Sequence, residues 1–100
     1  MPKPEESAVP SLFRVGSYLV YFWSNENNEP IHVHVAKGKP SQNATKVWLT
    51  KSGGCIVAGN SGKIPAQDLS EILDVIAAQY FWICAAWKEH FCTDDILFYC

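Results

Sequence analysis

Residues 25–37, Asn-Glu-Asn-Asn-Glu-Pro-Ile-His-Val-His-Val-Ala-Lys, carry the pattern around which the rest of the chain is arranged. An acidic, asparagine-rich turn leads directly into residues 31–35, where branched apolar residues alternate strictly with histidines. Successive side chains of a β-strand point to opposite faces of the sheet. The alternation therefore predicts a strand with its apolar residues on one face and with His32 and His34 together on the other.

The composition is that of one small globular domain. The chain has 100 residues, of which 48% are hydrophobic, 18% charged and 13% aromatic. These values predict a single packed core and argue against a disordered chain. The formal net charge is −2, and nucleic-acid binding needs several converging cations. Nucleic acid is therefore an unfavoured partner, although one weak cluster gathers four lysines: Lys37, Lys39, Lys46 and Lys51.

The first residues and the cysteines bear on the compartment. Residues 1–11 are polar and rich in proline, and they contain no apolar signal core, so we expect a disordered leader and a cytoplasmic protein. The four cysteines form no Cys-x-x-Cys pair, which favours reduced thiols. Residues 75–87 carry no charge, but thirteen residues are too few to span a membrane. We expect no membrane association.

Two kinds of periodicity define the fold class. Apolar and aromatic runs separated by turn residues predict strands over residues 17–23, 31–35, 45–50 and 55–58, with residues 13–15 leading into the first through a turn or bulge at Gly16. Apolar residues spaced three and four apart then predict one long amphipathic helix from about Pro65 to Phe91. We therefore expect an α+β domain over residues 12–92, with a small, mostly antiparallel sheet of three to four strands packed by one long C-terminal helix.

One face of the predicted helix carries two large aromatic residues where polar ones are expected. Phe81 and Trp82 lie on the polar side, and such a patch is rarely left in water. We expect something to cover them. The candidates are the tail, residues 93–100, which would dock on the helix or on a partner, and a second copy of the chain in a homodimer.

The two histidines are the strongest candidates for chemistry. Residues two apart on a strand lie about 6.6 Å apart on one face, so His32 and His34 could converge on a divalent metal ion. They could also act as a metal-free acid–base pair, with Glu26 and Glu29 as orienting carboxylates. A third metal ligand would come from one of these glutamates or from one of three later residues, His90, Asp94 and Asp95. The alternative is that the imidazoles are structural or contact a partner.

The stretch Tyr-Phe-Trp-Ser-Asn-Glu-Asn-Asn-Glu-Pro-Ile-His-Val-His-Val, residues 21–35, resembles the signature of the bacterial family catalogued as domain of unknown function 4160 (DUF4160). Residues 44–49 resemble its Ala-Lys-Phe-Trp-Leu strand, and residues 69–91 resemble its C-terminal helix. Ile31 stands where a second proline is common. The residues that match the motif and its aromatic anchors are Ser24, Asn25, Glu26, Glu29, Pro30, His32, His34, Trp48 and Trp87.

The resemblance implies little about activity, but such proteins often belong to small toxin–antitoxin-like operons. The leading hypothesis is thus an interaction component of such a system, with a protein partner on the histidine face or on the Phe81 and Trp82 face. Asn25 and Lys37 are further candidate contacts. A histidine-dependent, metal-assisted or metal-free, hydrolase or ribonuclease is the first alternative, and a phage or mobile-element inhibitor is the second. Whether the protein is an enzyme stays open.

Overall fold

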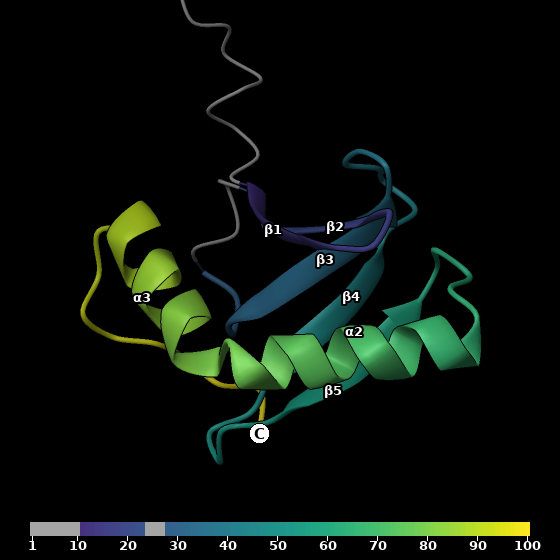
Figure 1. Cartoon of the computed structure of the whole chain (residues 1–100). Coiled ribbons are helices and arrows are strands. Elements are labelled where there is room, and N and C mark those ends of the chain that lie inside the picture. Colours follow the sequence, from purple (N-terminus) through teal and green to yellow (C-terminus); the bar gives the residue numbers. More distant parts are fainter. Residues whose placement is uncertain (1–10, 24–27) are drawn as a thin grey trace, which may run out of the picture.

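Five strands follow one another through a single antiparallel sheet in the computed structural model, which describes residues 11–23 and 28–100 (Figure 1). The strands are β1 (Ser11–Val15), β2 (Tyr18–Tyr21), β3 (His32–Lys37), β4 (Thr45–Leu49) and β5 (Cys55–Asn60). Their order in the sheet is their order in the sequence, so each strand runs antiparallel to the one before it. Apart from Ser11, the predicted leader lies outside the described residues.

The sheet has one strand more than the predicted three to four. The extra strand is β1, which pairs with β2 through partners such as Arg14 and Leu19. Gly16 has a φ of 59°, a left-handed conformation that glycine adopts at little cost, and it begins a tight turn between the two strands. The chain therefore reverses at Gly16, and the segment expected only to lead into β2 folds back as a hairpin partner.

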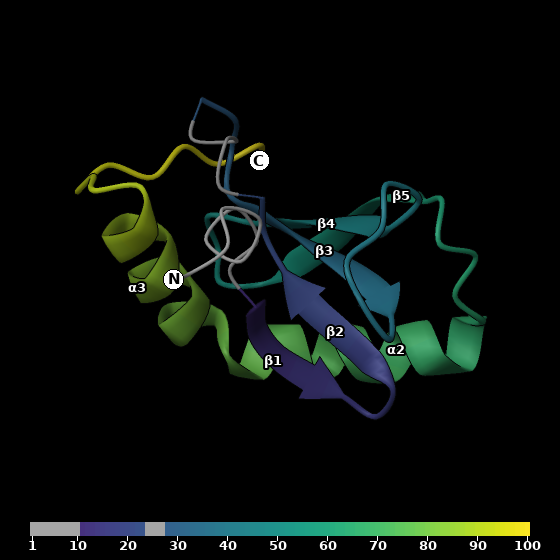
Figure 2. The same cartoon turned by 90° about the horizontal axis from the view of Figure 1, so that it is seen from above.

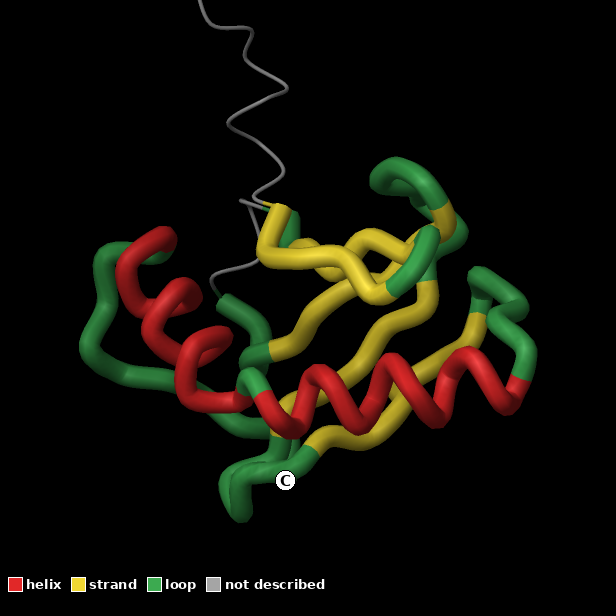
Figure 3. The backbone as a smooth tube through the Cα atoms, viewed as in Figure 1, coloured by secondary structure: helices red, strands yellow, loops and turns green. Residues whose placement is uncertain are grey.

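The predicted single long helix is two helices. They are α2 (Ala66–Ala78) and α3 (Tyr80–His90), and they meet at a bend of 71° around Gln79 (Figures 1 and 3). A straight helix of that length would extend about 37 Å, whereas strands of this length span only about 17–20 Å. The bend keeps Ile83 and Trp87 buried at the end of the sheet. In the described part of the chain, no single helix is long and apolar enough to cross a membrane. The bent pair together is long and apolar enough, judged by length and composition alone.

The core lies between the helices and one face of the sheet. The apolar residues of β3 that were predicted to share a face, among them Val33 and Val35, are fully buried here together with Val47 and Leu49 of β4. Ile72 and Ile76 of α2 and Ile83 of α3 close the core from the helix side. A smaller cluster, formed by Leu19, Tyr21 and Ala36, lies on the opposite face of the sheet.

The C-terminal tail crosses the end of the sheet and reaches the face away from α2 (Figure 2). The Ile31 amide donates a hydrogen bond to the Leu97 carbonyl (2.8 Å), and the Lys51 amide donates one to the Cys100 carbonyl (2.9 Å). Tyr99 then stacks on Trp48 of β4. The tail does not cover Phe81, which is 83% exposed, because its backbone hydrogen bonds hold it beside Ile31, just before β3, and beside the β4–β5 turn.

Candidate functional site

His32 and His34 project from β3 to the same side of the sheet, as the alternation predicts. Their ring centroids lie 4.9 Å apart and the two rings are nearly perpendicular. His32 comes at the start of the strand, where its ring contacts the indoles of Trp48 and Trp87 edge-on. Two adjacent strands and the end of α3 therefore fix the position of the first imidazole.

His32 is a core residue. Its side chain is 0% exposed, and its Nδ1 lies 2.8 Å from the carbonyl oxygen of Pro30. A carbonyl oxygen only accepts hydrogen bonds, so Nδ1 carries the proton in this contact. The imidazole is thus oriented by the backbone of the preceding turn. In this arrangement the ring has no contact with solvent, which favours a structural role for it.

His34 has a different environment. It is 9% exposed, its ring stacks on Tyr21 with centroids 5.6 Å apart, and the edge of Trp23 approaches it at 6.2 Å. The Tyr21 hydroxyl donates to the Ser41 carbonyl and accepts from the Ser41 amide, both at 3.0 Å. Two hydrogen bonds to Ser41 therefore position the ring that supports His34, and the imidazole borders a hollow in the sheet surface.

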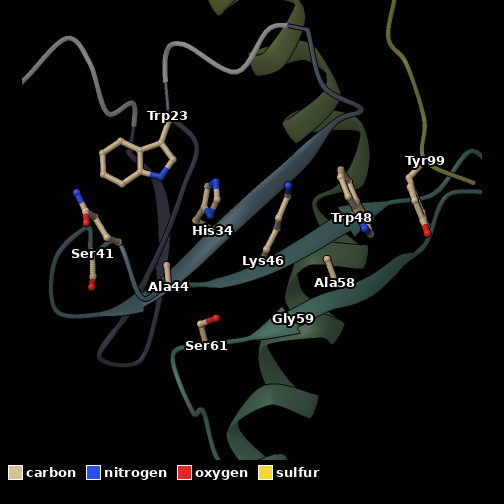
Figure 4. Close-up of a pocket in the computed structure, with 11 residues that line it drawn as sticks. Trp23, His34, Ser41, Ala44, Lys46, Trp48, Ala58, Gly59, Ser61 and Tyr99 are labelled. Atoms are coloured by element: carbon tan, nitrogen blue, oxygen red, sulfur yellow. The ribbon is translucent and has the colours of Figure 1, made fainter.

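This hollow, here called the sheet-face groove, has a volume of about 470 Å³ and lies on the side of the sheet that carries neither helix (Figure 4). Trp23 forms one end, Trp48 and Tyr99 form the other, and Lys46 stands between them (Figure 4). The remaining lining comes from small or polar residues: Ser41, Gln42, Ala44, Ala58, Gly59 and Ser61. The floor of the groove is thus lined by small side chains and its ends by aromatic rings, which leaves space for a flat ligand.

Lys46 is the cationic group of the groove. Its Nζ lies 2.9 Å from Oε1 of Glu29 and 4.3 Å from the ring centroid of Trp48. Both partners of the ion pair are partly exposed, at 29% and 43% of their side-chain surface, so water weakens their attraction. Glu29, which the sequence suggested as an orienting carboxylate for the histidines, has its described contact with Lys46 instead.

The predicted metal site is not completed by the described residues. Within residues 11–23 and 28–100, no group of three histidine, cysteine or acidic side chains could hold a metal ion. His90, one candidate third ligand, packs its ring against Phe22 and Phe91. Asn25 and Glu26 lie outside the described residues, so their predicted roles remain predictions.

The family model described as Domain of unknown function (DUF4160) matches residues 17–88, which is most of the chain and includes both histidines, Lys46 and Trp48. This chain belongs to the DUF4160 family. No curated protein and no solved structure matches it. The DUF4160 match ends before Tyr99 and begins after β1, so one wall of the groove and one edge of the sheet come from outside the matched residues.

Sequence reasoning found the histidine face of this DUF4160 chain but not the groove beside it. The sequence did contain a pattern that indicates part of the groove. Lys46 and Trp48 are two residues apart on β4, and they pair with His34 and His32 of β3. Residues paired across strands share a face, so the register alone would have placed all four together. Tyr99 had no such signal, because its position depends on the path of the tail.

The predicted partner contacts lie on separate surfaces. Phe81 is 83% exposed and Trp82 is 49% exposed at the start of α3. Lys37 ends β3 at the far end of the sheet and lines a second hollow of about 410 Å³. The aromatic pair therefore lies apart from the histidines, and Lys37 lines a neighbouring hollow and not the one that His34 borders.

Proposed function

We infer that this DUF4160 protein is an interaction component of a toxin–antitoxin-like pair, and that its partner is a second, different protein. The observation that carries this proposal is the exposure of Phe81 and Trp82 on neighbouring positions of α3. A small protein rarely leaves two such rings in water unless they form a contact surface. The family resemblance supports a role as one member of a two-gene system.

The surface around these rings suggests the shape of the partner. Trp82 contacts Phe13 of β1 with ring centroids 5.9 Å apart, and the two line a small hollow of about 200 Å³ with Leu12 and Gln79. β1 is one of the two edge strands of the described sheet, so a partner strand can add to it by main-chain hydrogen bonds. We define this aromatic edge as Leu12, Phe13, Phe81 and Trp82. None of its residues is charged, which favours a partner that presents an apolar strand or side chain.

The test is co-expression with the product of each adjacent gene, followed by co-purification and light scattering. We expect a stable heteromeric complex that is lost in the double variant Phe81→Ser, Trp82→Ser. Ala85→Ser is the matched control, because Ala85 is also exposed on α3 but lies outside the aromatic edge. A complex unaffected by the double variant would remove the aromatic edge as the docking surface. A stable homodimer broken by the double variant would replace the second protein with a second copy.

A histidine-dependent hydrolase or ribonuclease is the second candidate. It is favoured by one observation, that His34 and Lys46 border the same groove beside a second imidazole. The burial of His32 weighs against it. If expression arrests growth and His34→Ala relieves the arrest while Phe81→Ser does not, the enzyme replaces the interaction component. Metal analysis of the purified protein and of His32→Ala then tests the metal-assisted form.

An inhibitor from a phage or mobile element is the third candidate. It would bind through the same surfaces, but its expression would cause no growth arrest that depends on His34, and the purified protein would contain no metal.

A further inference from the structure

The sheet-face groove adjoins the second hollow, which lies at the end of the sheet. The two hollows, about 470 and 410 Å³, share Ser41 and Ser61 in their linings. Lys46 stands in the first, and Lys37 and Lys63 border the second. The two hollows therefore meet at these serines, and we call the pair the depression; its lining extends from the stacked rings at the tail to the loop after β5.

The charges of this depression differ from those of the whole chain. The formal net charge is −2, yet three of the eight basic residues line the two hollows, and no aspartate or glutamate belongs to the described residues that line them. Three of the acids instead lie on α2 at the opposite face: Asp68, Glu71 and Asp74. Glu29 offsets part of the charge of Lys46. A ligand in the depression meets a cationic surface, which selects for an anion.

The ends of the groove present aromatic faces. The rings of Trp48 and Tyr99 are parallel, with 6° between their planes and centroids 4.8 Å apart, and Tyr99 is 61% exposed. Trp23 stands at the other end, with Lys46 between the two (Figure 4). Every nucleobase has a face that stacks on such rings, while Lys46 between the rings and the two lysines of the second hollow can face the phosphates that link the bases.

Two hydrogen bonds close the loop that carries Lys63. The Asn60 side chain accepts a hydrogen bond from the Ile64 amide and donates one to the Ile64 carbonyl, both at 3.0 Å. Lys63 has a φ of 54°, which a lysine adopts only when its surroundings hold it there. A Cβ on Gly62 would lie 2.9 Å from Oγ1 of Thr45, so this loop closes tightly against β4. A loop ordered before binding loses little entropy when a ligand arrives.

From these observations we propose that the depression binds a single strand of nucleic acid. Its phosphates contact Lys46, Lys37 and Lys63, and its bases stack on the Trp48–Tyr99 pair and on Trp23. An acidic peptide would satisfy the lysines but would leave the ring faces unused. A duplex would present phosphates, but its bases stay stacked on one another. The site is separate from the aromatic edge, so it stands or falls independently of the protein partner.

The direct test measures fluorescence anisotropy of a fluorescein-labelled 12-nucleotide oligouridine RNA with the full chain at 50 and 200 mM KCl. Three phosphate contacts predict a slope of log K against log salt concentration of about −2, and hence roughly 20-fold weaker binding at the higher salt. Absence of binding at 50 mM KCl would overturn the proposal. So would equally tight binding of a 12-base-pair RNA duplex, or of polyglutamate in competition with the labelled strand.

Variants locate the site. Lys46→Ala and Lys63→Ala each reduce the magnitude of the salt slope by about 0.7, whereas Lys88→Ala, an equal change of charge on α3, leaves it unchanged. Tyr99→Ala weakens binding about fivefold or more, the lower end of measured stacking losses, and Tyr99→Phe retains binding because it keeps the ring. The thermal midpoint of each variant is measured in parallel. A folded Tyr99→Ala with wild-type affinity, or a Lys88→Ala as weak as Lys63→Ala, contradicts the assignment.

Discussion

The phenol ring of Tyr99 lies parallel to the indole of Trp48, 4.8 Å away between centroids, and so joins the C-terminal tail to β4, an inner strand of the sheet. β4 has a strand on each side, and the tail adds this contact from the face away from the helices. The stack therefore has two consequences. It builds one wall of the groove, and it stabilises the tail.

The first prediction concerns that stabilisation. Tyr99→Ala removes an aromatic pair, which contributes about 0.5–1.5 kcal/mol beyond the area it buries. We expect the free energy of unfolding to fall by about 1 kcal/mol and the thermal midpoint by about 4–8 °C. Leu97→Ala is the control, because Leu97 is exposed and its carbonyl still accepts from Ile31 after the change. An equal loss in both variants would show that the stack adds nothing specific.

The second prediction separates the two histidines. His32→Ala leaves a void between Trp48 and Trp87 and removes the hydrogen bond to Pro30, so we expect a loss of about 2–4 kcal/mol in urea denaturation. His34→Ala, at the border of the groove, should cost less. If the urea concentration at the unfolding midpoint of His32→Ala equals that of the wild type, the ring is not a structural part of the core.

The third prediction uses the hydroxyl of Tyr80, which donates a hydrogen bond of 2.5 Å to the Thr50 carbonyl. Burial first, and then the neighbouring Cys84 thiol, raise the pKa of Tyr80 above its ordinary value of 10.0. The unfolded chain therefore releases this proton at a lower pH than the folded chain. Its contribution to stability is complete below pH 10.0 and is lost as the pH rises toward the raised value.

Tyr80→Phe tests this pH dependence. At pH 7 the variant should lose about 1–2 kcal/mol, because the Thr50 carbonyl then lacks its donor. The difference between wild type and variant should shrink above pH 10, as measured by urea denaturation from pH 7 to 11. The comparison cancels the other groups whose raised pKa values act in the same range, such as Cys55. A constant difference across the range contradicts the assignment.

The fourth prediction concerns the loop that carries Lys63. Gly62→Ala places a Cβ 2.9 Å from Oγ1 of Thr45 and 3.2 Å from its amide nitrogen, so backbone must move. We expect a loss of about 1–3 kcal/mol in the free energy of unfolding. Gly59→Ala is the matched control, because nothing lies within 4 Å of a Cβ at that position, and it should stay within about 0.5 kcal/mol of wild type. Equal stability of the two variants would mean that the loop accommodates the methyl group.

The spacing of apolar residues in the sequence was sufficient to predict features that depend on a single strand or helix. The alternation over residues 31–35 correctly placed Val33 and Val35 on the face that packs against the helices, but it did not show that His32 is also buried. The three- and four-residue spacing correctly placed Ile72, Ile76 and Ile83 on the buried side of the helical segment. It did not show the bend at Gln79, since the spacing persists through it. The number of strands was too low because Gly16 suits both a bulge and a turn, and only pairing with β2 selects the turn.

By itself the sequence determined the class of fold, the buried faces and the adjacency of His32 and His34, because side-chain direction along a strand or helix follows from backbone geometry within a few residues. The tertiary structure alone decided that Glu29 pairs with Lys46, that Phe81 stays exposed and that Tyr99 reaches Trp48. These contacts join residues 17 to 51 positions apart or depend on what packs nearby, and the packing of the whole chain selects them from many alternatives of similar local energy.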